Sequence, residues 1–233
     1  MSKSASIAAL RELIEQRFPD ATPTTQRLSE HLATGMEALD RALPHGGFPR
    51  GQLSVWAPQG GCTAILRAAC HATVARGERA AWIDGDGTVA GAFWTEGPLL
   101  VRPTSRLHAL RAAEELLRSG GFALLVLAGT HPQGTEHVRL TRAAREGGAA
   151  LVSITTSASV ASLRLTSRLL DYRWQRTPFD EPALAHQVTA RVQARAVGWS
   201  AHADLSFPVT HHELRLSLDT ALVDRRGSPR RPH

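Results

Sequence analysis

The stretch GQLSVWAPQGGCTAIL, residues 51–66, decides the fold expected of this chain. Its pattern predicts a short buried strand over 52–56, a glycine-bearing turn, and a helix that begins near residue 62. That order is the layout of a phosphate-binding loop, in which backbone N–H groups at a helix N-terminus hold phosphate oxygens. The sequence therefore predicts the strand–loop–helix unit of a nucleotide-binding α/β fold.

The loop lacks the side chains that a working motif of the form G-x-x-x-x-G-K-[ST] requires. Ala57 stands where the first glycine belongs, and the loop is one residue short. If the gap lies inside the loop, Cys62 takes the lysine position and Thr63 the hydroxyl position; without the gap, Thr63 and Ala64 take them. Neither register supplies a lysine, and the only lysine in the chain is Lys3. We therefore expect an ATPase fold that serves a purpose other than ATP hydrolysis.

Composition is that of a soluble globular protein. The chain has 233 residues, 42% of them hydrophobic and 21% charged, enough for one domain with a small appendage. No apolar run approaches the roughly 20 residues that span a membrane, and no signal-peptide pattern opens the chain. The two cysteines show no zinc-ligand spacing. These features predict a cytoplasmic protein with reduced thiols, no metal and no membrane contact.

Strands and helices alternate through the middle of the chain. Apolar strands are predicted over 80–83, 99–101, 122–127 and 149–154, and helices over 62–76, 105–118 and 136–146. The apolar stripe of the helix over 105–118 is expected to comprise Leu107, Leu110, Ala113 and Leu117. This alternation predicts an α/β fold whose central sheet is mostly parallel and flanked by helices. After residue 160 the pattern changes to apolar–polar alternation over 163–174, 187–197 and 213–223, which predicts antiparallel edge strands.

The N-terminal segment is expected to be a separate amphipathic helix over residues 5–18. Its apolar stripe includes Ile7, Leu10, Ile14 and Phe18. Such a stripe must be covered either by the chain's own core or by a partner protein. The expected organisation is a docking helix and linker over 1–25, a core with C-terminal strands over 26–223, and a tail over 224–233.

The tail is basic and is expected to be disordered. Its arginines are Arg225, Arg226, Arg230 and Arg231. The chain as a whole carries a formal net charge of +6. The tail is therefore either a solvated end or an electrostatic tether to nucleic acid or to a partner.

Four segments together resemble the RecA-type recombinase core, over about residues 33–175. They are TGMEALDRALPHGGFPRG (34–51) before the loop strand, AAWIDGDG (80–87), LHALRAAEELLRSGGFALLVLAG (107–129) and AALVSITTSAS (149–159). In that family the second of these segments carries the catalytic glutamate and the third is the Walker B strand. The fourth leads to the second DNA-binding loop. The resemblance implies a RecA-like core for this chain.

The same resemblance implies that the nucleotide chemistry is lost. Ala128 holds the Walker B aspartate position, Asp86 holds the catalytic carboxylate position with Asp84 before it, and Thr155 or Thr156 replaces the glutamine that senses γ-phosphate. The degenerate site then comprises Ala57, Gly60, Gly61, Cys62, Thr63, Asp86 and Ala128. We expect no catalytic residue, no enzyme activity and no cofactor. Both DNA-binding loops are shortened, so direct DNA binding of the recombinase kind is expected to be weak or absent.

Within the RecA superfamily, the combination of a shortened core, degenerate ATP motifs, a docking N-terminal helix and β-rich C-terminal strands is most similar to the ImuA family. That resemblance implies a non-catalytic adaptor, induced by DNA damage in the SOS response, for mutagenic translesion synthesis. The implied partners are RecA, the Y-family polymerase homologue ImuB and, in addition, an error-prone replicative-type polymerase.

Two alternatives stay open. One is a SulA-type inhibitor of cell division, which binds the tubulin-like division protein. The other is a nucleotide-binding regulator, in which Gly60, Gly61 and the helix N-terminus hold a phosphate group.

Several side chains also have a purely structural interpretation. Cys62 is either a small replacement for lysine or a thiol activated by the helix N-terminus. Asp84 and Asp86 are interpreted as caps at a strand end. Trp56, Trp82 and Trp94 are expected in the core, whereas Trp174 and Trp199 are either buried or exposed interface anchors.

Overall fold

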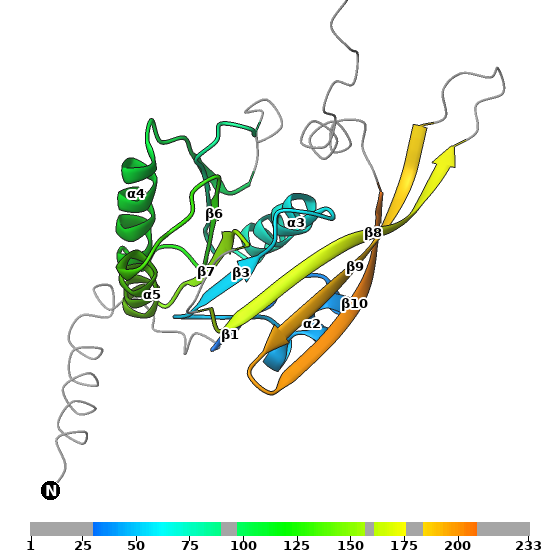
Figure 1. Ribbon diagram of the computed structural model, residues 1–233, viewed down its shortest axis with the longest axis horizontal. Coiled ribbons are helices and arrows are strands. Elements are labelled where there is room, and N and C mark those ends of the chain that lie inside the picture. The colour runs from blue at the N-terminus through cyan, green and yellow to red at the C-terminus, as the bar shows by residue number, and fades with distance from the viewer. Residues whose placement is uncertain (1–29, 90–96, 157–160, 176–183, 209–233) are drawn as a thin grey trace, which may run out of the picture.

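The computed structural model describes residues 30–89, 97–156, 161–175 and 184–208 (Figure 1). The helices are α2 (Glu37–Ala42), α3 (Cys62–Ala75), α4 (Arg106–Arg118) and α5 (Thr135–Gly147), with a 3-10 turn over Pro44–Gly46. The first strands are β1 (His31–Leu32), β2 (Phe48–Pro49), β3 (Leu53–Trp56), β4 (Ala80–Asp84) and β5 (Leu99–Val101). They are followed by β6 (Leu124–Ala128), β7 (Ala150–Ile154), β8 (Leu163–Gln175), β9 (Leu184–Ala196) and β10 (Trp199–Pro208).

One eight-stranded sheet organises the molecule, in the order β10-β9-β8-β3-β7-β6-β4-β5. The strands from β8 through β3 to β5 run parallel to their neighbours. Strands β9 and β10 continue β8 as an antiparallel meander, and β1 and β2 form a small separate ladder. The expected α/β class, with a mostly parallel sheet and antiparallel strands at one edge, is confirmed.

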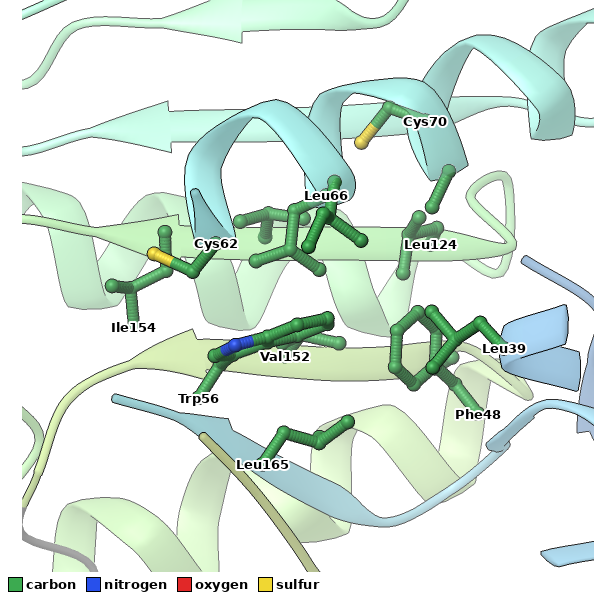
Figure 2. Close-up of a cluster of buried hydrophobic side chains, with 14 of the residues drawn as sticks. Leu39, Phe48, Trp56, Cys62, Leu66, Cys70, Leu124, Val152, Ile154 and Leu165 are labelled. Atoms are coloured by element: carbon green, nitrogen blue, oxygen red, sulfur yellow. The ribbon is translucent and has the colours of Figure 1, made fainter. Parts of the chain in front are cut away.

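Two hydrophobic clusters lie on opposite faces of this sheet. On one face α3 and α2 cover the strands, and Trp56, Leu66 and Val152 lie together there (Figure 2). On the other face α4 and α5 pack on β3, β4, β6 and β7 through residues such as Leu117, Leu125 and Leu151. Strand β6 is apolar, and so is β7 apart from Ser153, as is typical of strands that are buried on both faces.

The antiparallel meander is long, and Figure 1 shows β8 and β9 projecting beyond the parallel part of the sheet. Strand β10 was not among the expected strands. It is joined to β9 by a turn at Val197 and Gly198, where Gly198 has a φ of 70°. Its sequence alternates apolar and polar residues from Trp199 to Phe207, but two of the five inward residues are alanines and only Ala203 and Leu205 are buried. The strand expected over 213–223 lies outside the described residues.

Leu107 was expected on the buried stripe of the helix over 105–118, and this expectation was wrong. The side chain is 54% exposed, whereas Leu110, Ala113 and Leu117 are buried. At 100° per residue Leu107 lies about 120° around the helix from Ala113, away from the sheet. Trp56 and Trp82 are in the core as expected, Trp174 is exposed and Trp199 packs partly against the core.

The amphipathic segment over 5–18 and the basic tail lie outside the described residues, as does Trp94. The boundaries at 25 and 223 therefore stay predictions. Within the part of the chain that the structure describes, no helix is long and apolar enough to cross a membrane.

Candidate functional site: a closed phosphate-type loop

The loop over 57–61 joins the carboxyl end of β3 to the N-terminus of α3, as a phosphate-binding loop does. Gly60 and Gly61 have φ values of 61° and 82°, in the left-handed region that favours glycine. Gly61 caps α3, which runs for 14 residues. The backbone of Gln59 donates a hydrogen bond to the carbonyl of Ala57 at 2.8 Å, so the loop turns tightly before the helix.

Strand β8 holds this loop along one side. The backbone N–H of Ala57 donates to the carbonyl of Leu165 at 2.9 Å, which continues the pairing of β3 with β8. The hydroxyl of Ser167 donates to the carbonyl of Gln59 at 2.7 Å. A Cβ on Gly60 would lie 2.1 Å from the carbonyl oxygen of Ser167. The loop and the strand are therefore in backbone contact at this point.

Trp56 connects this contact to the hydrophobic core. Its indole Nε1 donates to Ser167 Oγ at 3.1 Å, and the side chain is fully buried. The Ser167 hydroxyl therefore accepts a hydrogen bond from the buried Trp56 indole and donates one to the backbone of the loop. It interrupts the inward residues Leu163, Leu165 and Leu169 of β8, and that break in the apolar alternation was the signal that could have identified it from the sequence.

Cys62 stands directly after the last loop glycine, with its side chain turned into the core. It is 4% exposed and belongs to the hydrophobic cluster that contains Leu66 and Ile154, both labelled beside it in Figure 2. Burial raises the pKa of the thiol above its ordinary value, and this effect outweighs the opposing hydrogen bonds from Thr63 and Gln59. A buried, protonated thiol is not an activated nucleophile. Thr63, the next residue, has its side chain exposed.

The two aspartates after β4 have different surroundings. Asp84 is buried and accepts hydrogen bonds from the backbones of Thr88 at 3.1 Å and Val89 at 2.9 Å, and from the Thr88 hydroxyl at 3.3 Å. Arg102 lies 3.8 Å from the same carboxylate. Asp84 therefore caps the turn after the strand, as its structural interpretation predicted. Asp86 is exposed.

The ends of β4 and β6 lie against each other. Asp84 is in register with Ala128, and the backbone of Gly85 donates to the Ala128 carbonyl at 2.9 Å. A Cβ on Gly129 would lie 2.4 Å from the Asp86 carboxyl carbon. The structure thus places Asp86 against Gly129, the residue after Ala128, at the carboxyl edge of the sheet, where ligands bind in open α/β folds. Among the described residues, no group of histidine, cysteine, aspartate or glutamate side chains could hold a metal ion.

No protein-family model matches the chain. The chain is similar to the protein RecA of Listeria welshimeri, of Listeria monocytogenes and of Listeria ivanovii. Each of these is 31% identical over 140 aligned residues, which cover 54% of this chain and 40% of the relative. The alignment with these curated relatives thus covers less than half of their own length.

The chain is related to RecA at the level of the superfamily. The strand–loop–helix unit, the mostly parallel sheet and the helices on both of its faces agree with that relationship.

Proposed function

We propose that this chain is a non-catalytic RecA-like adaptor of the ImuA kind in DNA-damage-induced mutagenic translesion synthesis. In this proposal it works in the cytoplasm and links RecA to a Y-family polymerase homologue, ImuB, with an error-prone replicative-type polymerase as a further partner. The observation that carries the proposal is the loop over 57–61. It keeps the backbone of a phosphate site, but it is fastened to β8 and is followed by the buried Cys62.

Loss of catalysis is supported position by position. A working loop presents a lysine ammonium to the β- and γ-phosphates, and Cys62 and Thr63 have no such charge. A working Walker B strand ends in a carboxylate that holds magnesium, and β6 ends in Ala128. Asp84 is occupied as a turn cap. A fold kept without this chemistry is suited to binding other proteins.

The adaptor is expected to use surfaces at both ends of the chain. The stripe of Ile7, Leu10, Ile14 and Phe18 would dock on a RecA protomer, because an apolar helix face must be covered. The C-terminal strands and the tail with Arg225, Arg226, Arg230 and Arg231 would hold the polymerase-like partner. The shortened loops over 130–135 and 155–162 leave few residues that could contact single-stranded DNA as the loops of a recombinase do.

The first experiment is capture of the tagged full-length chain from host cells after DNA damage, with mass spectrometry of what it retains. Recovery of RecA together with a Y-family polymerase homologue is the expected result. Recovery of the tubulin-like division protein in their place would contradict the adaptor and support a SulA-type inhibitor.

A pair of variants then tests the docking helix. Leu10→Asp with Ile14→Asp is expected to abolish RecA binding, because two charges would enter the apolar contact. The control pair, Arg11→Asp with Glu15→Asp on the polar face, should retain binding. Full binding by the first pair would contradict this surface. Binding of ATP at micromolar concentration by the wild-type chain would instead favour the nucleotide-binding regulator.

A further inference from the structure

The outer face of the β8–β9–β10 meander is an open, polar extension of the central sheet. Val55 of β3 packs under α4 and α5, and its partner in the neighbouring strand, Arg164, lies on the same face of the sheet. The two helices cover β3, β4, β6 and β7, and the sheet continues beyond them. On β8 the outward residues from Arg164 to Arg168 are exposed, whereas Leu165 and Ser167 between them are buried.

The strand register places arginines directly opposite each other on this face. Arg164 is paired with Arg195, and Arg168 is paired with Arg191. Like charges in directly opposite positions destabilise a sheet, so the arrangement costs stability unless an anion lies between them. The pairs are separated by one uncharged pair, Thr166 with Gln193 in the same register.

Over the stretch of β8 from Arg164 to Arg168, one carboxylate partly offsets this charge. Asp204 of β10 accepts two hydrogen bonds from Arg191, at 2.6 and 2.7 Å, and these lower the pKa of Asp204. Arg168 and Arg195 form no ion pair with any residue in the described ranges. Four arginines and one aspartate leave this part of the face with a net charge of +3.

The same face is hollowed beside the phosphate-type loop. The hollow has a volume of about 560 Å³ and is lined by Gln59, Thr166, Arg168, Arg191, Gln193 and His202 among others. None of its lining residues is acidic, and each of these side chains can donate a hydrogen bond. Such a surface is suited to phosphate oxygens.

The spacing of the arginines favours a duplex over a single strand. Arg164 and Arg168 are four residues apart on a strand, which corresponds to about 13 Å. That distance is close to the roughly 12 Å width of the major groove of B-DNA, so the two pairs can reach the backbones on both sides of a groove. Between them the imidazole of His202 is the only ring among the described residues, and no tryptophan, tyrosine or phenylalanine lies there on which unpaired bases could stack.

We propose that the outer face of β8, β9 and β10 binds the sugar-phosphate backbone of double-stranded DNA. Arg168 and Arg195 supply the phosphate contacts, since neither forms an ion pair with Asp204. Binding is independent of base sequence because phosphates carry no sequence information. This goes beyond the adaptor function and does not depend on it. In the adaptor, DNA and the polymerase-like partner would share the C-terminal strands. It also uses a different surface from the shortened loops, at which little DNA contact is expected.

The test is fluorescence anisotropy with the full chain and a labelled 24-base-pair duplex, at several salt concentrations. Wild type is expected to bind, with affinity that falls steeply with salt. Arg168→Gln with Arg195→Gln is expected to weaken binding at least about tenfold and to reduce the log–log salt slope by about two. Asp204→Asn is expected to tighten binding several-fold, because Arg191 loses its carboxylate partner.

The matched control removes two arginines elsewhere, through Arg41→Gln with Arg79→Gln. Arg41 is on α2 and Arg79 lies before β4, both exposed, so this pair should weaken binding less than about twofold. Equal losses of duplex affinity in the two double variants would show that net charge or the basic tail is responsible for binding, and would overturn the proposal. So would the absence of binding, or tighter binding of the corresponding single strand.

Two further measurements keep the result interpretable. The thermal unfolding midpoint of Arg168→Gln with Arg195→Gln should be equal to or above that of wild type, because each substitution removes one member of a like-charge pair. The other variants should change it by only a few degrees, because their side chains are exposed. Competition with a decameric glutamate peptide, at matched total charge, should displace little duplex. Efficient displacement by the peptide would assign the face to an acidic protein segment and overturn the DNA proposal.

Discussion

Gly60 and Ser167 are so close that a Cβ on the glycine would lie 2.1 Å from the serine carbonyl oxygen. The contact joins the loop after β3 to the middle of β8, more than 100 residues later in the chain. The loop cannot open on this side unless β8 moves with it. The same contact explains why Gly60 is required here even where no phosphate is held.

Gly60→Ala is expected to destabilise the fold by about 2–4 kcal/mol. The new Cβ meets the backbone of β8, and φ at this residue is 61°, so steric overlap adds to the cost of a left-handed conformation. Urea unfolding followed by circular dichroism measures the change. The control is Gly77→Ala, where φ is 80° but no atom lies within 4 Å of the new Cβ. It should cost only about 1–2 kcal/mol, and equal costs for the two variants would contradict a close contact with β8.

Ser167→Ala is expected to loosen the loop over 57–61. The substitution removes the acceptor of the buried Trp56 indole N–H and the donor to the Gln59 carbonyl. Leaving a buried donor unpaired costs about 1–3 kcal/mol. Hydrogen exchange should become faster at the amides of this loop. Ser162→Ala, which removes a hydrogen bond to Leu53 on the far end of β3, is the control. Unchanged exchange in the loop of Ser167→Ala would show that the serine does not hold it.

The two aspartates after β4 should respond very differently to substitution. Asp84→Ala is expected to cost about 2–4 kcal/mol, because the Thr88 and Val89 donors lose their acceptor in a buried site. Asp86→Ala is expected to cost less than about 0.5 kcal/mol, because its side chain is exposed. The thermal unfolding midpoints of the two variants measure this difference in stability. A large effect at Asp86 with little at Asp84 would contradict the assignment of Asp84 as the turn cap.

The stability of the fold should decrease above about pH 9, partly through Cys70. Burial raises the pKa of this thiol to about 12, from an ordinary value of 9.0. Below pH 9 the thiol is protonated in both states. Between pH 9 and 12 only the unfolded chain ionises, so unfolding becomes more favourable by up to about 1.4 kcal/mol per pH unit.

Urea unfolding from pH 8 to 10.5 measures this dependence. Cys70→Ala should lower stability at pH 8 but flatten its decrease with pH, since the alanine cannot ionise. Cys62, whose pKa burial also raises, should leave part of the slope in place. Parallel curves for wild type and Cys70→Ala would show that the Cys70 thiol does not contribute.

The sequence was sufficient to predict those strands and helices whose burial follows one short local pattern of apolar residues. The apolar runs that became β6 and β7 predicted strands buried on both faces, and the alternation with helices predicted a parallel sheet. The missing lysine and the alanine at 128 can be read from the sequence alone. Leu107 was predicted incorrectly because it lies in the first turn of α4, beside the stripe that faces the sheet. Strand β10 was missed although its apolar and polar residues alternate regularly from Trp199 to Phe207.

The amino-acid sequence by itself determined the α/β class, the place of the degenerate loop and the chemistry that it lacks. Only the tertiary structure decided that β8 closes on that loop through Ser167, that Cys62 points into the core, and that two arginine pairs face each other on an open sheet. The physical reason is that local pattern reports which face of an element is buried. Contacts between residues 60 and 167, or 168 and 191, depend on strand order and register, which many distant residues fix together.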